Sequence, residues 1–151
     1  MLQTWSLPFK VNQMSVRSYR DLRVWNEAMN LVVAAYRIAK QLPTEERFEL
    51  SSQIRRAAVS IPANVAEGHG RDHLGDYLRH LSVANGSLME VETEVLIAER
   101  IGYVTAEDVA PAMTLAADVG RMLSGLTQSL KGKYHSRAPG HRTPGTGHRW
   151  K

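Results

Sequence analysis

The stretch from Asp72 to Ile101 reads DHLGDYLRHLSVANGSLMEVETEVLIAERI. Its apolar residues recur at steps of three and four, the spacing that places side chains on one face of an α-helix. They are Leu74, Leu78, Leu81, Ala84, Leu88, Val91, Val95 and Ala98. Gly102 follows, and glycine is typical of the residue just after a helix. The stretch therefore predicts a long amphipathic helix, which needs partner helices to cover its apolar face.

Three further segments, at about residues 18–42, 44–70 and 105–130, show the same apolar spacing. The links between the four segments are short, so successive helices should run in opposite directions. The sequence shows neither the alternating pattern of β-strands nor an internal repeat. We therefore predict an all-α fold, an antiparallel up-down-up-down four-helix bundle over residues 18–131.

Proline and threonine residues mark where the predicted helices begin, end or bend. Pro43 ends the first helix, and Thr44 is an N-cap candidate for the second. Pro62 lies inside the second helix and predicts a kink or a break near residues 59–61, because proline lacks the N–H that a helix needs. The stretch Thr105–Asp108 is similar to a capping box and predicts the start of the fourth helix.

The first predicted helix carries two neighbouring apolar stripes where one is enough to join a core. One stripe consists of Leu22, Trp25, Met29, Val32, Tyr36 and Ala39, and the other of Ala28, Leu31, Ala35, Ile38 and Leu42. Two explanations remain open at this point. The helix has either a broad buried face within its own bundle or a second contact with another subunit.

Positive charge is concentrated at one end of the chain. The 151 residues include 19 Lys and Arg against 15 Asp and Glu, and no cysteine, which excludes disulfides and thiolate zinc sites. Six of the cations and none of the acids lie in residues 131–151, so the rest of the chain is slightly acidic. We predict a disordered basic tail over residues 132–151 and a flexible extension over residues 1–17.

The sequence contains no run of about 18 or more apolar residues that would cross a membrane. Its first ten residues, MLQTWSLPFK, lack the basic-then-apolar order of a signal peptide. We expect a cytoplasmic protein without a membrane partner.

Polar residues interrupt the apolar pattern of the second and third helices. Gln53, Arg56, Ser60, Asn64 and Glu67 are spaced three or four apart, and Asn85, Ser87, Glu90 and Glu94 follow on the next helix. Such spacing places the first set on one helical face, beside the apolar stripe. One hypothesis is a binding site built from Arg56, Asn64, Glu67 and Glu90. The other is an internally satisfied polar network that sets the register of the helices and bridges Pro62.

Histidines and acids also occur at spacings that could suit a metal. His69, His73, Asp76 and His80 lie near one another in the sequence, but surrounding glycines would hold them poorly. No glutamate has a histidine three residues later, as di-metal bundles require. The sequence contains neither the nucleophile elbow of serine hydrolases nor a glycine-rich phosphate-binding loop after a strand. We expect no catalysis, no metal and no cofactor.

Residues 53–68, QIRRAAVSIPANVAEG, followed by Gly70 and Arg71, closely resemble the signature of four-helix-bundle proteins encoded in 23S rRNA intervening sequences. These proteins are also described as S23 ribosomal protein-like. Further matches are Asp21-Leu22, Val24-Trp25, Pro43, Glu46-Arg47, Ala84 to Ser87, Glu90, and Met122, Leu123 and Leu126. The resemblance covers about residues 18–131, and Asn85 stands where many members have arginine.

This resemblance implies a small antiparallel bundle that assembles as a homopentamer. The family that the chain resembles is related to the accessory variability proteins of diversity-generating retroelements, which bind a reverse transcriptase and nucleic acid. By analogy, we expect a non-enzymatic oligomeric module that contacts RNA or DNA, or an RNA-associated protein such as a reverse transcriptase. The alternative is a structural homo-oligomer or protein–protein scaffold without nucleic-acid binding.

Arginines and lysines in and just after the second helix and at the basic end of the chain are the candidate nucleic-acid contacts, since phosphate binding by such groups does not depend on base sequence. They are Arg55, Arg56, Arg71, Lys131, Lys133, Arg137, Arg142, Arg149 and Lys151. An enzyme or metal protein that uses Glu67, Glu90, His69 and His73 is the least favoured hypothesis.

Overall fold

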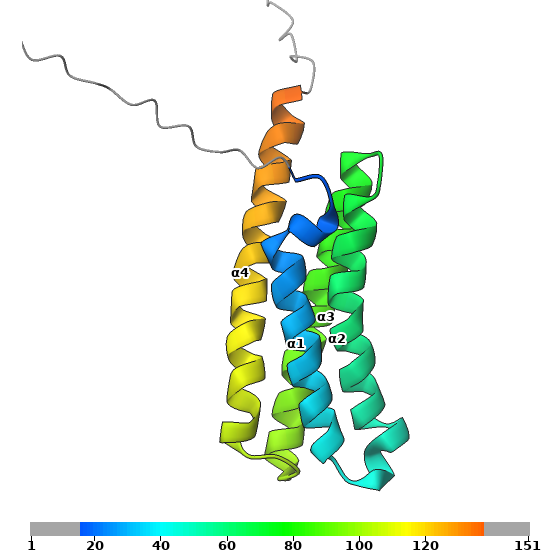
Figure 1. Cartoon of the computed structure of the whole chain (residues 1–151), viewed down its shortest axis with the longest axis vertical. Helices are drawn as coiled ribbons and strands as arrows, with labels where there is room; N and C mark the ends of the chain where they lie inside the picture. The colour runs from blue at the N-terminus through cyan, green and yellow to red at the C-terminus, as the bar shows by residue number, and fades with distance from the viewer. Residues whose placement is uncertain (1–15, 138–151) are drawn as a thin grey trace, which may run out of the picture.

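The computed structural model describes residues 16–137, which form four long helices and two short 3-10 turns (Figure 1). The elements are η1 (Tyr19–Asp21), α1 (Arg23–Gln41), η2 (Thr44–Phe48), α2 (Leu50–His69), α3 (Leu74–Ile101) and α4 (Ala106–Arg137). In Figure 1 the chain reverses direction at each connection between successive helices. The predicted all-α four-helix fold is confirmed.

Each long helix packs against two neighbours, so α1 and α3 lie diagonally across the bundle. α1 contacts mainly α2 and α4, and α3 contacts the same two helices. The largest fully buried side chains come from all four helices and include Leu31, Ile38, Ile54, Ile61, Leu81, Leu88, Val119 and Leu123. The outward faces of α1 and α3 therefore point to opposite sides of the molecule.

The two apolar stripes of α1 differ in how deeply their side chains are buried. Ala28, Leu31, Ala35, Ile38 and Leu42 are all buried in the core. In the other stripe, Ala39 is buried, Leu22, Trp25 and Val32 are half-buried, and Met29 and Tyr36 are exposed. The broad-face explanation thus accounts for part of the second stripe, and an apolar strip of α1 remains at the surface of the single chain.

Two predicted helix ends are confirmed by their hydrogen bonds. Thr105 Oγ1 accepts from the backbone N–H of Asp108, and Asp108 Oδ2 accepts from the backbone N–H of Thr105, as in a capping box. After α3, Gly102 adopts a φ of 91°, a left-handed conformation that glycine adopts without steric cost.

The beginning of α2 differs from the prediction. Thr44 is the first residue of η2, and α2 begins only at Leu50, because Glu49 leaves the helical region with φ −107° and ψ −114°. The Glu46 carboxylate then accepts from the backbone N–H of Leu50, which satisfies one of the free donors of the new helix.

We predicted a kink or a break at Pro62, and the break does not occur, since α2 is one continuous helix from Leu50 to His69. A proline inside a helix costs about 3 kcal/mol or more because it loses one hydrogen bond and crowds the preceding turn. Pro62 itself is buried together with Ile61 and Val65. Packing of this segment against the other helices offsets the local cost.

At the other end of the bundle, α4 continues through residues 132–137, which we predicted as part of the disordered tail. A helix that is already formed gains one hydrogen bond for each added residue, and cations such as Lys131 and Lys133 are favourable at its carboxyl end. The remaining predicted tail, residues 138–151, and residues 1–15 lie outside the described part of the chain. No helix within residues 16–137 is long and apolar enough to cross a membrane.

The carboxyl end of α2 and the amino end of α3 approach each other closely at Gly68. A Cβ atom built on Gly68 would lie 2.8 Å from the Cβ of His80 and 2.8 Å from the Cδ2 of Tyr77. Such contacts are too short for any side chain, so only glycine permits this helix spacing.

We predict that Gly68→Ala destabilises the fold by about 1–3 kcal/mol, because the added methyl group overpacks the α2–α3 contact. The matched control is Gly75→Ala, since a Cβ at Gly75 meets nothing within 4 Å. That control should leave stability unchanged or raise it by up to about 1 kcal/mol. Chemical denaturation of both variants measures the difference, and equal stabilities would contradict the close approach.

Candidate functional site

A chain of hydrogen-bonded polar side chains runs between α2 and α3. His80 Nδ1 lies 3.0 Å from Asn64 Oδ1, and Asn64 Nδ2 donates to the backbone carbonyl of Ser60 at 2.8 Å and to its Oγ at 3.1 Å. Ser87 Oγ donates to Ser60 Oγ at 2.8 Å. An amide oxygen only accepts, so His80 must carry its proton on Nδ1. Ser60, Asn64 and Ser87 form the kind of satisfied network that the second hypothesis describes.

Glu67 extends this chain of hydrogen-bonded side chains to the surface of the protein. Its carboxylate forms an ion pair with Arg71, and its Oε1 lies 3.8 Å from Nε2 of the buried His80. Arg71 was a candidate nucleic-acid contact, and in the structure its guanidinium is already paired with Glu67.

His80 was considered only as a metal ligand, although it lies one turn before Ala84 on the apolar stripe of α3. That position could have marked it as a buried partner of α2.

A pocket of about 330 Å³ lies further along the same helix pair. It is lined by Gln53, Arg56, Ala57 and Ser60 from α2 and by Glu90 and Glu94 from α3. Glu94 is only 9% exposed, and its Oε2 has no hydrogen-bond partner within the described part of the chain. Burial, together with the nearby charge of Glu90, raises the pKa of Glu94 to about 7.

The structure divides the predicted four-residue site into two places. Asn64 and Glu67 belong to the polar chain around His80, whereas Arg56 and Glu90 line the carboxylate pocket. Arg56 is exposed and has no ion pair within residues 16–137, so it is not held by the carboxylate of Glu90.

Asn85 does not join the other polar residues of α3. It is exposed and lines a different hollow with Ser82, Leu123 and Lys131, between α3 and α4. Residues two apart on a helix differ by about 200° in direction, so Asn85 and Ser87 must face different neighbours. Of the polar residues noted on this helix, Asn85 therefore lies apart from the network between α2 and α3.

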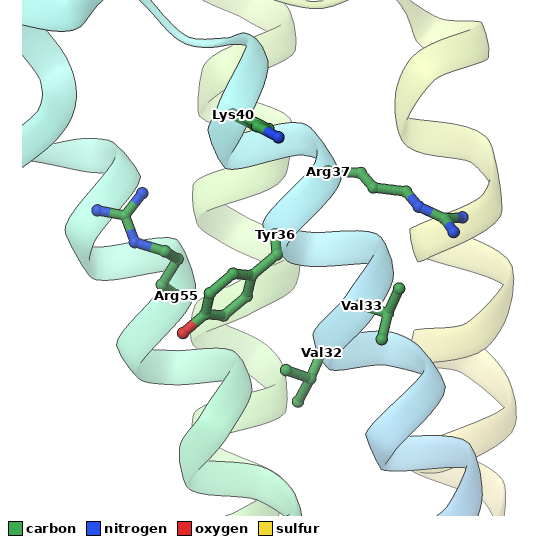
Figure 2. Close-up of a pocket in the computed structure, with 6 residues that line it drawn as sticks. All are labelled: Val32, Val33, Tyr36, Arg37, Lys40 and Arg55. Carbon is green, nitrogen blue, oxygen red and sulfur yellow. The ribbon is translucent and has the colours of Figure 1, made fainter.

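A second pocket, of about 520 Å³, lies on the outer surface of α1 beside α2. We call it the basic groove, and it is lined by Val32, Val33, Tyr36, Arg37, Lys40 and Arg55 (Figure 2). Tyr36 points from α1 towards Arg55, whose guanidinium donates to the backbone carbonyl of Arg47 at 3.2 Å. Arg37 and Lys40 follow along α1, with Arg37 directed away from Tyr36 (Figure 2). No acidic residue lines this groove.

Of the groove's residues, only Arg55 was predicted as a nucleic-acid contact. Arg37 and Lys40 are three residues apart and therefore on one face of α1, a signal that the sequence contains. Tyr36 was assigned to an apolar stripe, yet it is 45% exposed. The cations gather only when α1 and α2 pack side by side.

The remaining predicted nucleic-acid contacts lie elsewhere. Lys131 and Lys133 are exposed near the carboxyl end of α4, and Arg137 is the last residue of that helix. This end of α4 lies at the opposite end of the bundle from the carboxyl end of α1 (Figure 1). Arg142, Arg149 and Lys151 lie outside the described residues. Between residues 16 and 137, no group of three or more His, Asp or Glu is arranged to hold a metal ion.

We predict that Glu94→Gln flattens the pH dependence of stability. In the unfolded chain Glu94 ionises near its ordinary pKa of 4.5, whereas in the fold it retains its proton up to about pH 7. The folded state therefore binds more protons over this range, and its stability falls as the pH rises from about 4.5 to 7. Relative to the wild type, the variant should gain up to about 3 kcal/mol between pH 5 and pH 8.

Urea denaturation at the two pH values measures this gain, and Glu99→Gln on the same helix is the control. Glu99 does not line the pocket, so its variant should follow the wild type. Parallel pH profiles for Glu94→Gln and the wild type would show that Glu94 ionises normally in the fold.

Comparisons with known proteins identify a matching family profile and a solved structure of similar fold. Residues 20–125 match the profile of the family described as 23S rRNA-intervening sequence protein. A solved structure from Bacteroides thetaiotaomicron VPI-5482, described as a protein with unknown function from the S23 ribosomal protein family, has a similar fold with a TM-score of 0.65. It is 24% identical, and the alignment covers 70% of this chain and 98% of that one. No curated protein matches the chain. With the family profile covering most of its length, this chain belongs to the 23S rRNA-intervening sequence protein family.

Proposed function

We propose that this protein is a self-associating, non-enzymatic module that binds RNA through the basic groove. The observation that carries this proposal is the groove itself, in which three cations border an apolar floor with an exposed tyrosine and no acid. Residues 16–137 carry 15 Lys and Arg against 15 Asp and Glu, so such a local excess of positive charge is not a consequence of composition.

The residue types of the groove suit single-stranded RNA. Arg37, Lys40 and Arg55 provide donors for phosphate oxygens, and arginine can bind a phosphate with two parallel hydrogen bonds. Tyr36 offers a ring face on which a base can stack, a contact worth about 1–3 kcal/mol per base. The cations near the end of α4 would add electrostatic attraction at a distance from the groove.

Self-association is supported by the outward face of α3. Five large apolar side chains are exposed there, namely Val83, Met89, Leu96, Ile97 and Ile101. Exposed apolar residues gathered on one helix are typical of a contact with another subunit. Since α3 is diagonal to α1, this contact would leave the basic groove accessible. A pentamer is the number that family resemblance implies.

The same α3 face favours the second candidate function, a scaffold that contacts proteins and not nucleic acid. An RNA-associated partner, such as a reverse transcriptase, would fit either function. The two candidates differ in whether the isolated protein binds RNA in a salt-dependent way.

We predict that Arg37→Gln/Lys40→Gln weakens binding of a labelled single-stranded RNA and reduces its salt dependence. Each lost phosphate contact should make the slope of log Kd against log salt shallower by about 0.7, so the double variant should lose about 1.4. Tyr36→Leu should lower affinity with little change in slope, because stacking involves no counterion release. Fluorescence anisotropy over a range of salt concentrations measures both quantities.

The control for this experiment is Arg23→Gln/Arg121→Gln, which removes two exposed cations outside the groove. It should retain most of the affinity and slope. If the full-length protein shows no salt-sensitive RNA binding at low ionic strength, the scaffold function replaces the proposed one.

We also predict that Leu96→Lys/Ile97→Lys dissociates the assembly into monomers, because buried lysines would remain unpaired in the contact. Light scattering coupled to size exclusion measures the mass. Ala110→Lys/Ala117→Lys adds the same charge at exposed positions of α4 and should leave the mass unchanged. A wild-type protein that is monomeric at all concentrations would contradict self-association.

A further inference from the structure

The carboxylate pocket between α2 and α3 shares no lining residue with the basic groove, and a shallow hollow that includes Tyr36, Arg55, Arg56 and Ser60 lies between them. The proposed RNA binding does not use the pocket. Its walls carry oxygen acceptors from both helices: the carboxyl groups of Glu90 and Glu94, the amide oxygen of Gln53 and the hydroxyl of Ser60. Ser60 already accepts from Ser87, which leaves the two carboxyl groups and Gln53 as the main unused acceptors.

Two buried side-chain atoms in the described part of the chain lack a hydrogen-bond partner, Nε2 of His80 and Oε2 of Glu94, and of these two residues only Glu94 lines the pocket. Its Oε2 is completely buried and lacks a hydrogen bond within residues 16–137, although the side chain lines an open pocket. A buried carboxyl oxygen without a partner carries a desolvation cost that a donor would remove. Glu90, one turn earlier on the same face of α3, adds a second negative group.

No donor within the described bundle meets this need. The charged groups lining the pocket are Glu90 and Glu94 from α3 and Arg56 from α2. Arg56 is exposed and makes no ion pair with either carboxylate within 4.0 Å. The pocket thus presents one buried and one exposed carboxyl group to whatever enters from solvent.

We propose that this pocket binds a cationic nitrogen group, a guanidinium or a primary ammonium, with Glu94 as its buried anchor. Such a group carries several N–H donors close together, which can reach the two carboxylates and the Gln53 amide oxygen at once. Its charge compensates both acids, whereas a neutral donor compensates neither. The source is either a free small molecule or the Arg or Lys side chain of a second copy of this chain.

Binding of a cation and of a proton compete at Glu94. The cation pairs best with the ionised carboxylate, and the carboxyl is mostly protonated at pH 6 because its pKa is about 7. Ionisation rises about tenfold between pH 6 and pH 8, so the affinity for the cation should rise about tenfold over the same range.

The first test is a titration of ¹⁵N-labelled full-length protein with ethylguanidinium chloride, followed by NMR at constant ionic strength. We expect saturable shifts of the backbone amides of residues 53–60 and 90–94, with about tenfold tighter binding at pH 8 than at pH 6. Ethylurea, a neutral probe of similar shape, should produce no saturable shift. The absence of saturation at pH 8, or an equal response to ethylurea, would overturn the proposal.

Variants separate the role of Glu94 from a general effect of charge. Glu94→Gln keeps the shape of the side chain and should weaken binding at least tenfold and abolish its pH dependence. Glu99→Gln removes the same charge outside the pocket and should bind like the wild type. Arg56→Gln should tighten binding, because it removes the cation that repels the ligand at the pocket wall. Thermal melts confirm that each variant is folded, and normal pH-dependent binding by Glu94→Gln would refute its assignment.

Light scattering during the same titration identifies the source of the cation. If ethylguanidinium lowers the mass of the assembly, it displaces the side chain of a second copy from the pocket. If it binds without a change in mass, the pocket takes a free ligand.

Discussion

The close contact between α2 and α3 is the constraint on which the rest of the structure depends. Gly68 lets the two helix backbones approach, and this approach places His80 of α3 beside Asn64 of α2. The polar chain that starts there is compatible with only one register of the two helices, since a shift by one residue would turn His80 and Ser87 away from their partners. Polar groups buried between helices favour one alignment in this way because any other leaves them unpaired.

Most of the fold could be predicted because helical periodicity is a local signal repeated many times along the chain. The number of helices, the capping box at Thr105 and the stop at Gly102 all follow from residues within a few positions of one another. The errors lie where tertiary packing decides. The continuity of α2 through Pro62 depends on packing against other helices, which no local pattern encodes. The late start of α2 follows from the backbone of Glu49, with the Glu46 carboxylate accepting from the N–H of Leu50.

The candidate sites were less predictable, because spacing along one helix identifies a face but not what faces it. The spacing places Gln53, Arg56, Ser60, Asn64 and Glu67 on a common face of α2. Only the packing of α3 decides that Asn64 contacts a histidine and that Arg56 forms no ion pair within residues 16–137. The basic groove shows the same limit of a prediction made from single helices. Its cations come from two helices, Arg37 and Lys40 from α1 and Arg55 from α2, so neither helix alone shows all three. Glu94 was noticed as polar, but its burial could not be read from α3 alone.

Net charge is a poor guide to the partners of this protein. At physiological ionic strength, charges more than about 8 Å apart are largely screened at the surface, so each partner responds to the groups nearest to it. Here the groove beside α1 carries three cations and no acid, whereas the pocket beside α3 carries the two carboxyl groups of Glu90 and Glu94 together with Arg56. An anionic chain and a cationic group could therefore occupy the two sides of one helix at the same time, although the whole chain has a formal charge of only +4. The division of charge by α2, set by its packing between α1 and α3, determines what each surface can bind.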